Sequence, residues 1–246
     1  MSGATSPVDA PMTDAPMTKD TAITKTFNGP IIWDLDGTIM DSLPGILNSI
    51  AHSLRSLGLA VPEELRHWAG PPFPHSLRTE LGLDETQVEQ AVAAYREYYV
   101  TTGSFLSTPF DGVIDIVRRG QTAGRVQATA TSKPISQAID MLKRHDIFHA
   151  FSALGAASDD EKRSAKYDVL DDALTALHDH GFSTEDAVMV GDRIHDFEAA
   201  AEHGLPSIAA TWGYGTESEW AQATLRAESP AHLSELLALP IAVRRG

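Results

Sequence analysis

The sequence predicts an α/β fold: a parallel sheet covered by helices, with an all-helical domain inserted into it. Two patterns indicate this fold. Strand-like apolar runs alternate with helical repeats along most of the chain, which is typical of parallel sheets. A stretch with only helical patterns follows directly after the first apolar run. We therefore expect a tail over residues 1–27, a core formed by residues 28–42 and 108–246, and a helical cap formed by residues 43–107.

The core elements are predicted from short apolar runs and from helical periodicity. The first strand is expected in the apolar run that begins at Ile31 and ends in the carboxylates Asp34 and Asp36. Later strands are expected at Arg125–Thr131, Ala150–Leu154, Ala187–Val190 and Ser207–Thr211, and helices at Val113–Arg119, Ile135–Arg144, Lys166–His180 and His195–His203.

The cap is predicted from apolar residues that recur at three- and four-residue spacing after Ser42, up to a closing glycine at Gly58. Further helices are expected at about Pro62–Trp68, Pro74–Leu81 and Asp84–Val100. Short connections that contain Gly37, Pro109 and Gly112 suit hinges between cap and core.

Composition narrows the possible partners and the location. The net charge of −15 argues against nucleic acid and anionic membranes as partners, and no apolar run is long enough to span a membrane. The chain has no cysteine, which excludes disulfides and thiolate metal sites and fits a reducing compartment such as the cytoplasm. The tail has few large apolar residues and no secretory signal, so we expect it to be disordered.

Two carboxylates follow the first strand, in Asp34-Leu35-Asp36-Gly37-Thr38. Alternation along a strand would place Asp34 and Asp36 on one face, where their like charges repel. A Mg²⁺ ion between them would remove this repulsion, and Mg²⁺ prefers oxygen ligands. The sequence therefore predicts a magnesium site at this end of the strand.

Three other strand ends carry polar residues, and ligands of open α/β sheets bind beyond such ends. Thr131 and Ser132 precede a helix start, where hydroxyl and backbone N–H groups form an anion site or an ordinary helix cap. Lys166 stands at the start of a later helix. Asp192 and Asp196 follow the strand Ala187–Val190, and their four-residue spacing would place them on one helix face.

Together these residues resemble the haloacid dehalogenase superfamily of phosphohydrolases. Its four motifs match Asp34–Thr38, Thr131, Lys166 and Gly191–Asp196 in order. A helical cap directly after the first motif is similar to the subgroup that includes phosphoglycolate phosphatases. So are several short runs: Asp41-Ser42, Gly70-Pro71-Pro72, Thr131-Ser132-Lys133-Pro134, Gly191-Asp192-Arg193 and Gly213-Tyr214-Gly215.

The resemblance implies a Rossmann-like core and an enzyme, a Mg²⁺-dependent phosphatase. Its partner would be a small phosphorylated metabolite such as phosphoglycolate, a nucleotide or a sugar phosphate. Asp34 would attack phosphorus and form an aspartyl-phosphate. Asp36 would protonate the leaving alkoxide and later activate water.

The resemblance also implies the remaining ligands. Mg²⁺ would be held by the Asp34 side chain, the Asp36 backbone carbonyl and Asp192. Thr131, the Ser132 backbone and Lys166 would hold phosphoryl oxygens, and Asp196 would orient Lys166 or water. The family reads its substrate from the cap, where Trp68, Gly70 and Phe73 are the candidates in this chain.

Two other functions compete with a phosphatase. A phosphomutase of the β-phosphoglucomutase type shares every motif, and only its product distinguishes it. A binding module on a decayed fold is disfavoured because Asp34, Asp36 and Lys166 are all present. A phosphonatase would need a cap lysine, and no lysine occurs between Lys25 and Lys133. The leaving group and the oligomeric state stay open.

Overall fold

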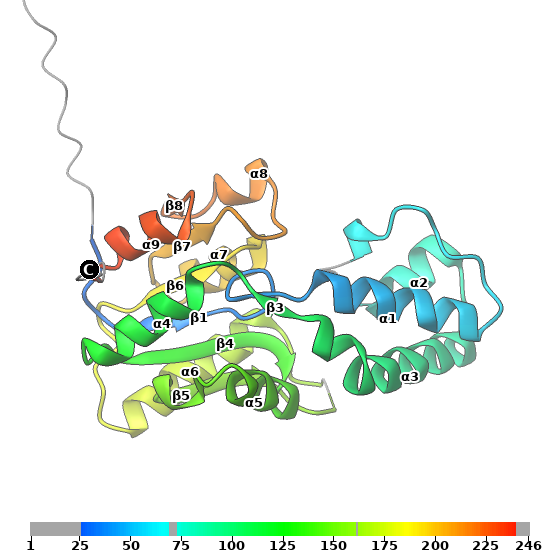
Figure 1. Cartoon of the computed structure of the whole chain (residues 1–246), viewed down its shortest axis with the longest axis horizontal. Helices are drawn as coiled ribbons and strands as arrows, with labels where there is room; N and C mark the ends of the chain where they lie inside the picture. The colour runs from blue at the N-terminus through cyan, green and yellow to red at the C-terminus, as the bar shows by residue number, and fades with distance from the viewer. Residues whose placement is uncertain (1–25, 69–72, 161, 240–246) are drawn as a thin grey trace, which may run out of the picture.

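The core is a parallel sheet of six strands in the order β5-β4-β1-β6-β7-β8 (Figure 1). The computed structural model describes residues 26–68, 73–160 and 162–239. The predicted α/β class with a helical insertion is confirmed. The strands are β1 (Ile31–Trp33), β4 (Gln127–Pro134), β5 (Ala153–Ala157), β6 (Val188–Gly191), β7 (Ser207–Ala210) and β8 (Leu225–Ala227).

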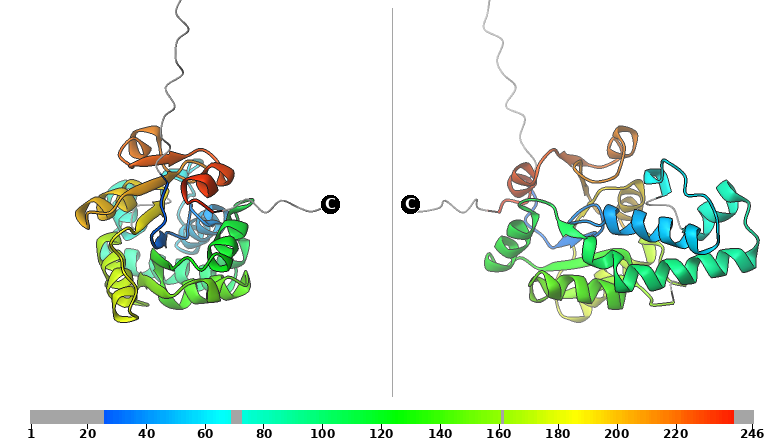
Figure 2. Two further views of the ribbon diagram at one scale, coloured as in Figure 1. Left: turned by 90° about the vertical axis from the view of Figure 1, so that its left-hand side faces the viewer. Right: turned by 45° about the vertical axis from the view of Figure 1, so that its right-hand side comes forward.

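Helices cover both faces of the sheet (Figure 2). Ile31 and Trp33 of β1 lie in one buried cluster and Ile32 lies in the other, as alternation along a strand requires. The first cluster includes residues of α4 (Val113–Thr122), α5 (Ile135–Arg144) and α9 (Pro230–Leu236), and the second includes residues of α6 (Lys166–Asp179) and α7 (Ile194–Glu202).

The cap is a separate helical unit with its own apolar cluster (Figure 1). It contains α1 (Leu43–Ser56), α2 (Phe73–Leu81) and α3 (Glu85–Thr101), with 3₁₀ turns at Arg66–Trp68 and Gly103–Leu106. The antiparallel pair β2 (Met40–Asp41) and β3 (Thr108–Pro109) joins it to the core. Cap and core therefore meet through two short neighbouring connections, at the positions where the sequence predicts hinges.

Some predicted elements differ from the structure. The helix expected at Pro62–Trp68 is wrong, because a 3₁₀ turn at Arg66–Trp68 suffices to bury Leu65 and Trp68. The strand expected at Arg125–Thr131 begins two residues later and runs to Pro134, past the hydroxyl motif. Strand β8, the short helix α8 (Glu217–Trp220) and α9 were not predicted, because none is long enough to show a period.

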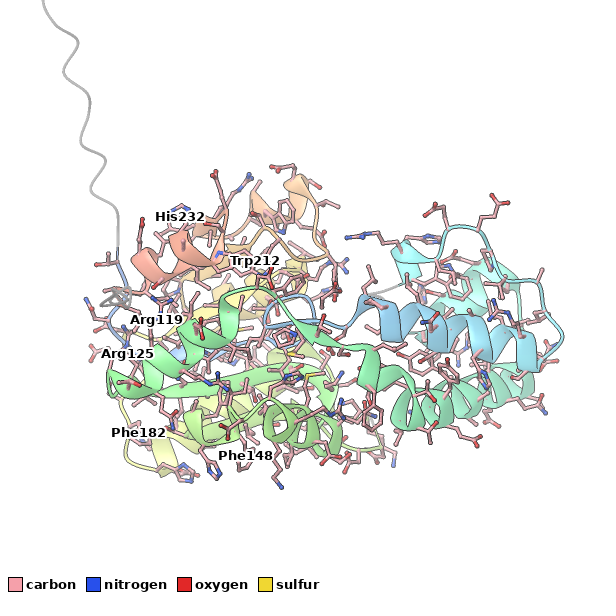
Figure 3. The ribbon with its side chains drawn as sticks, viewed as in Figure 1. Arg119, Arg125, Phe148, Phe182, Trp212 and His232 are labelled. Atoms are coloured by element: carbon pink, nitrogen blue, oxygen red, sulfur yellow. The ribbon has the colours of Figure 1, made fainter. Side chains whose placement is uncertain are left out.

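The start and end of the described chain meet at the end of the core farthest from the cap. Phe27 is buried, and its backbone N–H donates to Leu236 O at 2.8 Å, so the core reaches into the expected tail. Residues 1–25 of that tail lie outside the described residues. Arg125, which is labelled in Figure 3, donates to Gly29 O and Leu237 O at 2.5 and 2.7 Å. Within the described ranges, no helix is both long and apolar enough to cross a membrane.

Trp33 makes a buried polar contact inside the core. Its Nε1–H donates to Gln127 Oε1 at 3.0 Å, and both residues are fully buried. We predict that Trp33→Phe lowers the free energy of unfolding by about 1–3 kcal/mol, because the buried Gln127 oxygen then loses its donor. Urea unfolding of Trp33→Phe, Gln127→Leu and the double variant measures the coupling between the two side chains. Additive losses would show that the hydrogen bond is not the cause.

Candidate active site

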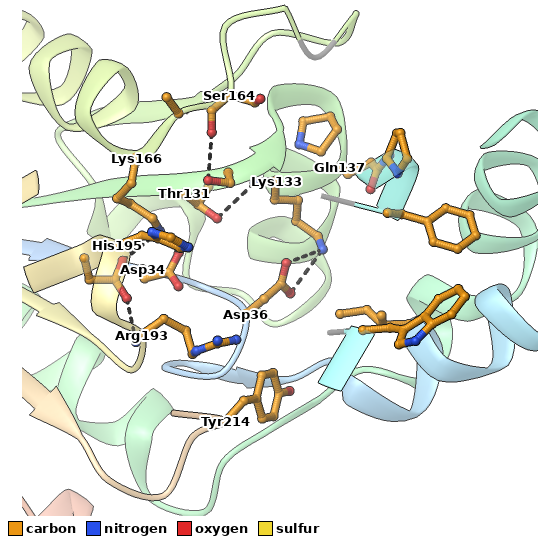
Figure 4. Close-up of a pocket in the computed structure, with 18 of the residues that line it drawn as sticks. Asp34, Asp36, Thr131, Lys133, Gln137, Ser164, Lys166, Arg193, His195 and Tyr214 are labelled. Carbon is orange, nitrogen blue, oxygen red and sulfur yellow. Dashed lines mark hydrogen bonds and ion pairs between the residues drawn. The ribbon is translucent and has the colours of Figure 1, made fainter. Parts of the chain in front are cut away.

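The predicted site residues gather where three adjacent strands end. Strand β1 lies between β4 and β6, so the residues that follow these strands share one edge of the sheet. Asp34 follows β1, Thr131 lies in the last part of β4, and Asp192 follows β6. Between this edge and the cap lies a cleft of about 800 Å³ (Figure 4).

Lys166, the first residue of α6, connects two of the carboxylates. Its Nζ lies 2.7 Å from Asp34 Oδ1 and 2.9 Å from Asp196 Oδ1, and it donates to Ala130 O at 3.1 Å. Burial opposes the charge, but Asp196 and Asp34 raise the pKa of Lys166 above its ordinary value. Lys166 is therefore a buried ammonium that points into the cleft beside Asp34 (Figure 4).

Burial disfavours the charged form of the two aspartates that follow β1 and β6. It raises the pKa of Asp34 to about 6, although Lys166 acts in the opposite direction. It also raises the pKa of Asp192 well above the ordinary value, and the charges of Asp196 and Asp34 add to this effect. These carboxylates would gain from a cation placed among them.

A carboxylate oxygen from each of Asp34, Asp192 and Asp196 lies within 4.8 Å of the others, close enough to hold a metal ion. Asp196 is already engaged, because its Oδ2 accepts the N–H groups of Asp192 and Arg193 at 3.1 and 3.0 Å, and its Oδ1 contacts Lys166. Asp34 and Asp192 are therefore the better donors. The contact of Asp196 with Lys166 is the arrangement that the family resemblance implies.

Glycines allow the acidic residues to approach so closely. Gly37 has a φ of 85°, and a Cβ at this position would lie 2.3 Å from Asp192 Oδ2. A Cβ at Gly191 would lie 2.3 Å from Asp196 Cγ. The glycines of both aspartate motifs thus leave room for the carboxylates.

The carboxylates of Asp36 and Asp34 do not face a common partner in the way that strand alternation predicts. Its carboxylate pairs with Lys133 Nζ at 2.8 Å and accepts a hydrogen bond from the Ser42 hydroxyl. The prediction failed because β1 ends at Trp33, so the alternation of a strand does not extend to residue 36. The structure thus separates the two carboxylates: Asp34 contacts Lys166, and Asp36 contacts Lys133 (Figure 4).

Lys133 is a site residue to which the sequence motifs assign no role, although it lies in the Thr131-Ser132-Lys133-Pro134 run. It is buried, and its Nζ also donates to the Tyr99 hydroxyl of cap helix α3 at 2.7 Å. Burial opposes its charge, but Asp36 and Tyr99 raise the pKa of Lys133 above its ordinary value. The sequence signal that could have identified Lys133 as a site residue is its position directly after the hydroxyl residues Thr131 and Ser132 at a strand end.

Tyr214 is a second residue without a predicted role. Its backbone N–H donates to Asp192 Oδ2 at 2.7 Å. Its hydroxyl oxygen accepts the N–H groups of Ser42 and Leu43 at 2.6 and 2.9 Å and lies 3.0 Å from Asp41 Oδ1, to which it donates. Tyr214 thus links the aspartate cluster to the first turn of the cap.

The other predicted residues also border the cleft. The Thr131 hydroxyl oxygen accepts the Lys133 N–H at 3.2 Å, and the Ser132 hydroxyl donates to Ser164 O at 2.8 Å (Figure 4). Trp68 and Phe73 line the cap side. Gly70 lies outside the described residues.

A parallel sheet with clustered aspartates at its strand ends, a buried lysine and an inserted helical cap is the architecture that the four motifs imply. The chain belongs to the haloacid dehalogenase-like hydrolases, whose family model matches residues 31–210. The predicted family is thereby confirmed.

Three curated relatives carry the names of different activities. "Tyrosine-protein kinase PtkA" of Mycobacterium tuberculosis is 41% identical over 187 residues, which are 75% of this chain and 62% of PtkA, so this chain spans less than two thirds of that relative. A solved PtkA structure superposes with a TM-score of 0.73 at 37% identity, covering 87% of this chain and 99% of that one. A "5'-nucleotidase" of Pseudomonas aeruginosa is 32% identical over 82% of this chain and 89% of the relative. A "phosphoglycolate phosphatase" of Aliivibrio fischeri is 30% identical over 75% and 84%.

The raised pKa of Asp34 predicts how the stability of the metal-free protein depends on pH. Its ordinary value is 3.8 and its folded value about 6, so the folded state binds the proton more tightly. Protonated Asp34 therefore adds at most about 3 kcal/mol to the free energy of unfolding. This contribution is complete below pH 3.8 and is lost as the pH rises through about 6.

Urea unfolding in the presence of a chelator, over this pH range, measures how the free energy of unfolding changes with pH. Asp34→Asn is the matched control, because it cannot titrate and should have a flatter profile. If the free energy of unfolding depended on pH equally in both proteins, the raised pKa of Asp34 in the folded state would be contradicted.

Proposed function

We propose that this protein is a Mg²⁺-dependent phosphatase that hydrolyses a small phosphomonoester through an aspartyl-phosphate. The observation that carries this proposal is the position of Asp34, buried at the end of β1, 2.7 Å from Lys166 and facing the cleft. A carboxylate in this position has a cation beside it that can also bind a phosphoryl oxygen. Membership of the hydrolase family supports the same chemistry.

Each residue has a role that suits its contacts. The Asp34 carboxylate attacks phosphorus, and the bond from phosphorus to the ester oxygen breaks. Lys166 and the Thr131 hydroxyl bind the equatorial oxygens, where negative charge is spread during transfer. Asp36, on the cap side of Asp34, delivers a proton to the leaving oxygen and removes one from the water that later attacks the aspartyl-phosphate.

A divalent ion fits the donor set beside Asp34. Asp34 and Asp192 supply carboxylate oxygens, and the Asp36 backbone carbonyl can supply a third oxygen, all of the hard type that Mg²⁺ prefers. When bound, the ion neutralises the aspartates and the phosphate dianion, so that two anions can approach each other. Asp196 is then left to hold Lys166.

The same first step serves two other reactions, which differ in the group that accepts the phosphoryl from Asp34. Transfer to a sugar hydroxyl would make a phosphomutase. Transfer to a tyrosine hydroxyl is suggested by the 41% identity with the relative named PtkA. Water is the acceptor that we favour, because two other relatives carry phosphatase or nucleotidase names.

The test is phosphate release from a panel of phosphomonoesters, with Mg²⁺ and with EDTA. We expect release that depends on Mg²⁺ and returns when the ion is restored. Isomerised sugar phosphate would indicate a mutase, and phosphorylation of a tyrosine peptide from ATP a kinase. Full activity in EDTA would contradict the metal assignment.

Asp34→Asn is predicted to abolish turnover without loss of the fold. The amide keeps the shape of the side chain but cannot act as a nucleophile, so activity should fall below about 1% of the parent, a loss of at least ~2.7 kcal/mol in transition-state stabilisation. Circular dichroism checks the fold. Activity that persists above this level in a protein free of contaminating phosphatase would exclude covalent catalysis by Asp34.

A further inference from the structure

The cap side of the cleft is a row of aromatic rings, which we call the aromatic wall (Trp68, Phe73, Tyr95 and Tyr99). Neighbouring ring centroids are 6.1, 5.0 and 5.8 Å apart in that order, and the planes of Tyr95 and Tyr99 lie within 10° of each other. All four side chains line the cleft. The wall begins beside the reacting carboxylates, because the Tyr99 hydroxyl contacts Lys133.

The chemistry of this side favours a large apolar or aromatic group. Among the described cap residues that line the cleft, Arg96 is the only one with a formal charge, and the rest are aromatic, aliphatic or proline. A cleft of about 800 Å³ is far larger than a two-carbon acid needs. Rings at 5–6 Å spacing offer stacking surface to a planar group.

The position of the wall also indicates how far that planar group lies from phosphorus. Tyr95 and Tyr99 are one turn apart on α3, about 6 Å along the helix. A ring held by Phe73 and Tyr95 therefore needs a spacer about as long as a pentose between itself and the phosphate. An aryl phosphate has no spacer, so its ring would reach only Tyr99.

Building on the phosphatase activity proposed above, we propose that the substrate is a nucleoside 5'-monophosphate whose base stacks on Phe73 and Tyr95. The ribose then spans the gap beside Tyr99. Trp68 is 2% exposed, its Nε1–H donates to Glu80 at 2.7 Å, and its ring packs against Phe73.

The test compares kcat/KM for four esters: a nucleoside 5'-monophosphate, ribose 5-phosphate, phosphoglycolate and 4-nitrophenyl phosphate. We expect the nucleotide to exceed ribose 5-phosphate by about tenfold or more, which is about 1.4 kcal/mol from the base. Tyr95→Leu should remove most of that advantage and leave the ribose 5-phosphate value within about twofold, since it removes the ring on which the base would stack. Tyr98→Leu is the matched control, because Tyr98 stacks on His52 and is not among the lining residues.

The measured preferences distinguish a failure of the base-stacking proposal from a failure of the phosphatase function on which it rests. Equal rates for nucleotide and ribose 5-phosphate, or a preference for phosphoglycolate, would overturn the base-stacking proposal while the phosphatase function stands. A preference for the aryl ester would overturn the spacer argument. No phosphate release from any ester would contradict the phosphatase function itself.

A second inference rests on the contacts of Lys133. This buried ammonium donates to both oxygens of Asp36, at 3.1 and 2.8 Å, and to the Tyr99 hydroxyl, at 2.7 Å. Asp36 and Lys133 belong to the core, whereas Tyr99 belongs to the cap. Lys133 thus links Asp36 to Tyr99 by hydrogen bonds across the boundary between core and cap.

These contacts make the direction of the Asp36 carboxylate depend on the position of the cap. Tyr99 reaches Lys133 only while α3 lies against the core, and Ser42, which also donates to Asp36, directly precedes the first cap helix. Without the Tyr99 hydroxyl, the buried ammonium would lack one of its acceptors. Its hold on Asp36 would change with it.

We infer that Tyr99 and Lys133 are positioning residues that aim the Asp36 carboxylate at the leaving oxygen when the cap lies against the core. The inference rests on the acid role proposed for Asp36. Proton delivery matters for a strongly basic alkoxide and little for 4-nitrophenolate. A fault in positioning Asp36 should therefore depend on the leaving group, whereas a fault in packing or phosphate binding should not.

The experiment measures kcat/KM, which reports the first phosphoryl transfer, for the best alkyl ester of the panel and for 4-nitrophenyl phosphate. Tyr99→Phe removes one oxygen and should lower the alkyl value by about tenfold while changing the aryl value less than about twofold. Lys133→Met should show the same pattern more strongly. Tyr98→Phe, the matched control on the same helix, should change neither value.

Equal losses on both esters, or no loss on either, would overturn the positioning role. If Lys133→Met fails to fold, Tyr99→Phe decides alone, since it keeps the ring and its stacking. A parent protein that cleaves neither ester would contradict the phosphatase function rather than the positioning role.

Discussion

The site depends on one constraint: four carboxylates meet at one edge of the sheet in a chain of net charge −15. Two buried lysines offset part of this charge. Lys166 contacts Asp34 and Asp196, and Lys133 contacts Asp36. Among the described residues, the Asp192 carboxylate accepts the Tyr214 N–H at 2.7 Å and lies 3.4 Å from the Thr38 hydroxyl, and burial together with the charges of Asp196 and Asp34 raises its pKa. The uncompensated charge beside Asp34 is therefore what a divalent cation would neutralise.

The same groups also connect the cap to the core, so charge and cap position are linked. Tyr214 binds Asp192 through its backbone and the start of α1 through its hydroxyl. Lys133 binds Asp36 and Tyr99. A movement of the cap would therefore change the partners of Lys133 and of the Tyr214 hydroxyl, in addition to opening the cleft to water.

The sequence predicts the core and the acidic motifs well because both arise from local patterns. Apolar runs place β1, β4 and β6, and the carboxyl ends of parallel strands meet at one edge, so local patterns alone bring Asp34 and Asp192 together. The partners of Asp36 do not follow from such patterns. Strand alternation stops at Trp33, and the contacts with Lys133 and Ser42 depend on how the following turn and the cap are placed. Short elements such as β8 also lack enough residues to show a period.

The division between core and cap explains why the reaction is easier to infer from this chain than its substrate. The aspartates at the sheet edge lie against glycines, Asp192 against Gly37 and Asp196 against Gly191, which leaves little room for any other residue at the glycine positions. The cap presents mainly side-chain surface to the cleft, and a surface of rings and aliphatic groups constrains the shape of a ligand more than its chemistry. The base and ribose of the proposed substrate would lie along that surface, because the aromatic wall runs from Tyr99, which contacts Lys133, to Tyr95 one helical turn away. The distance along α3 thus carries information about the substrate that no single motif contains.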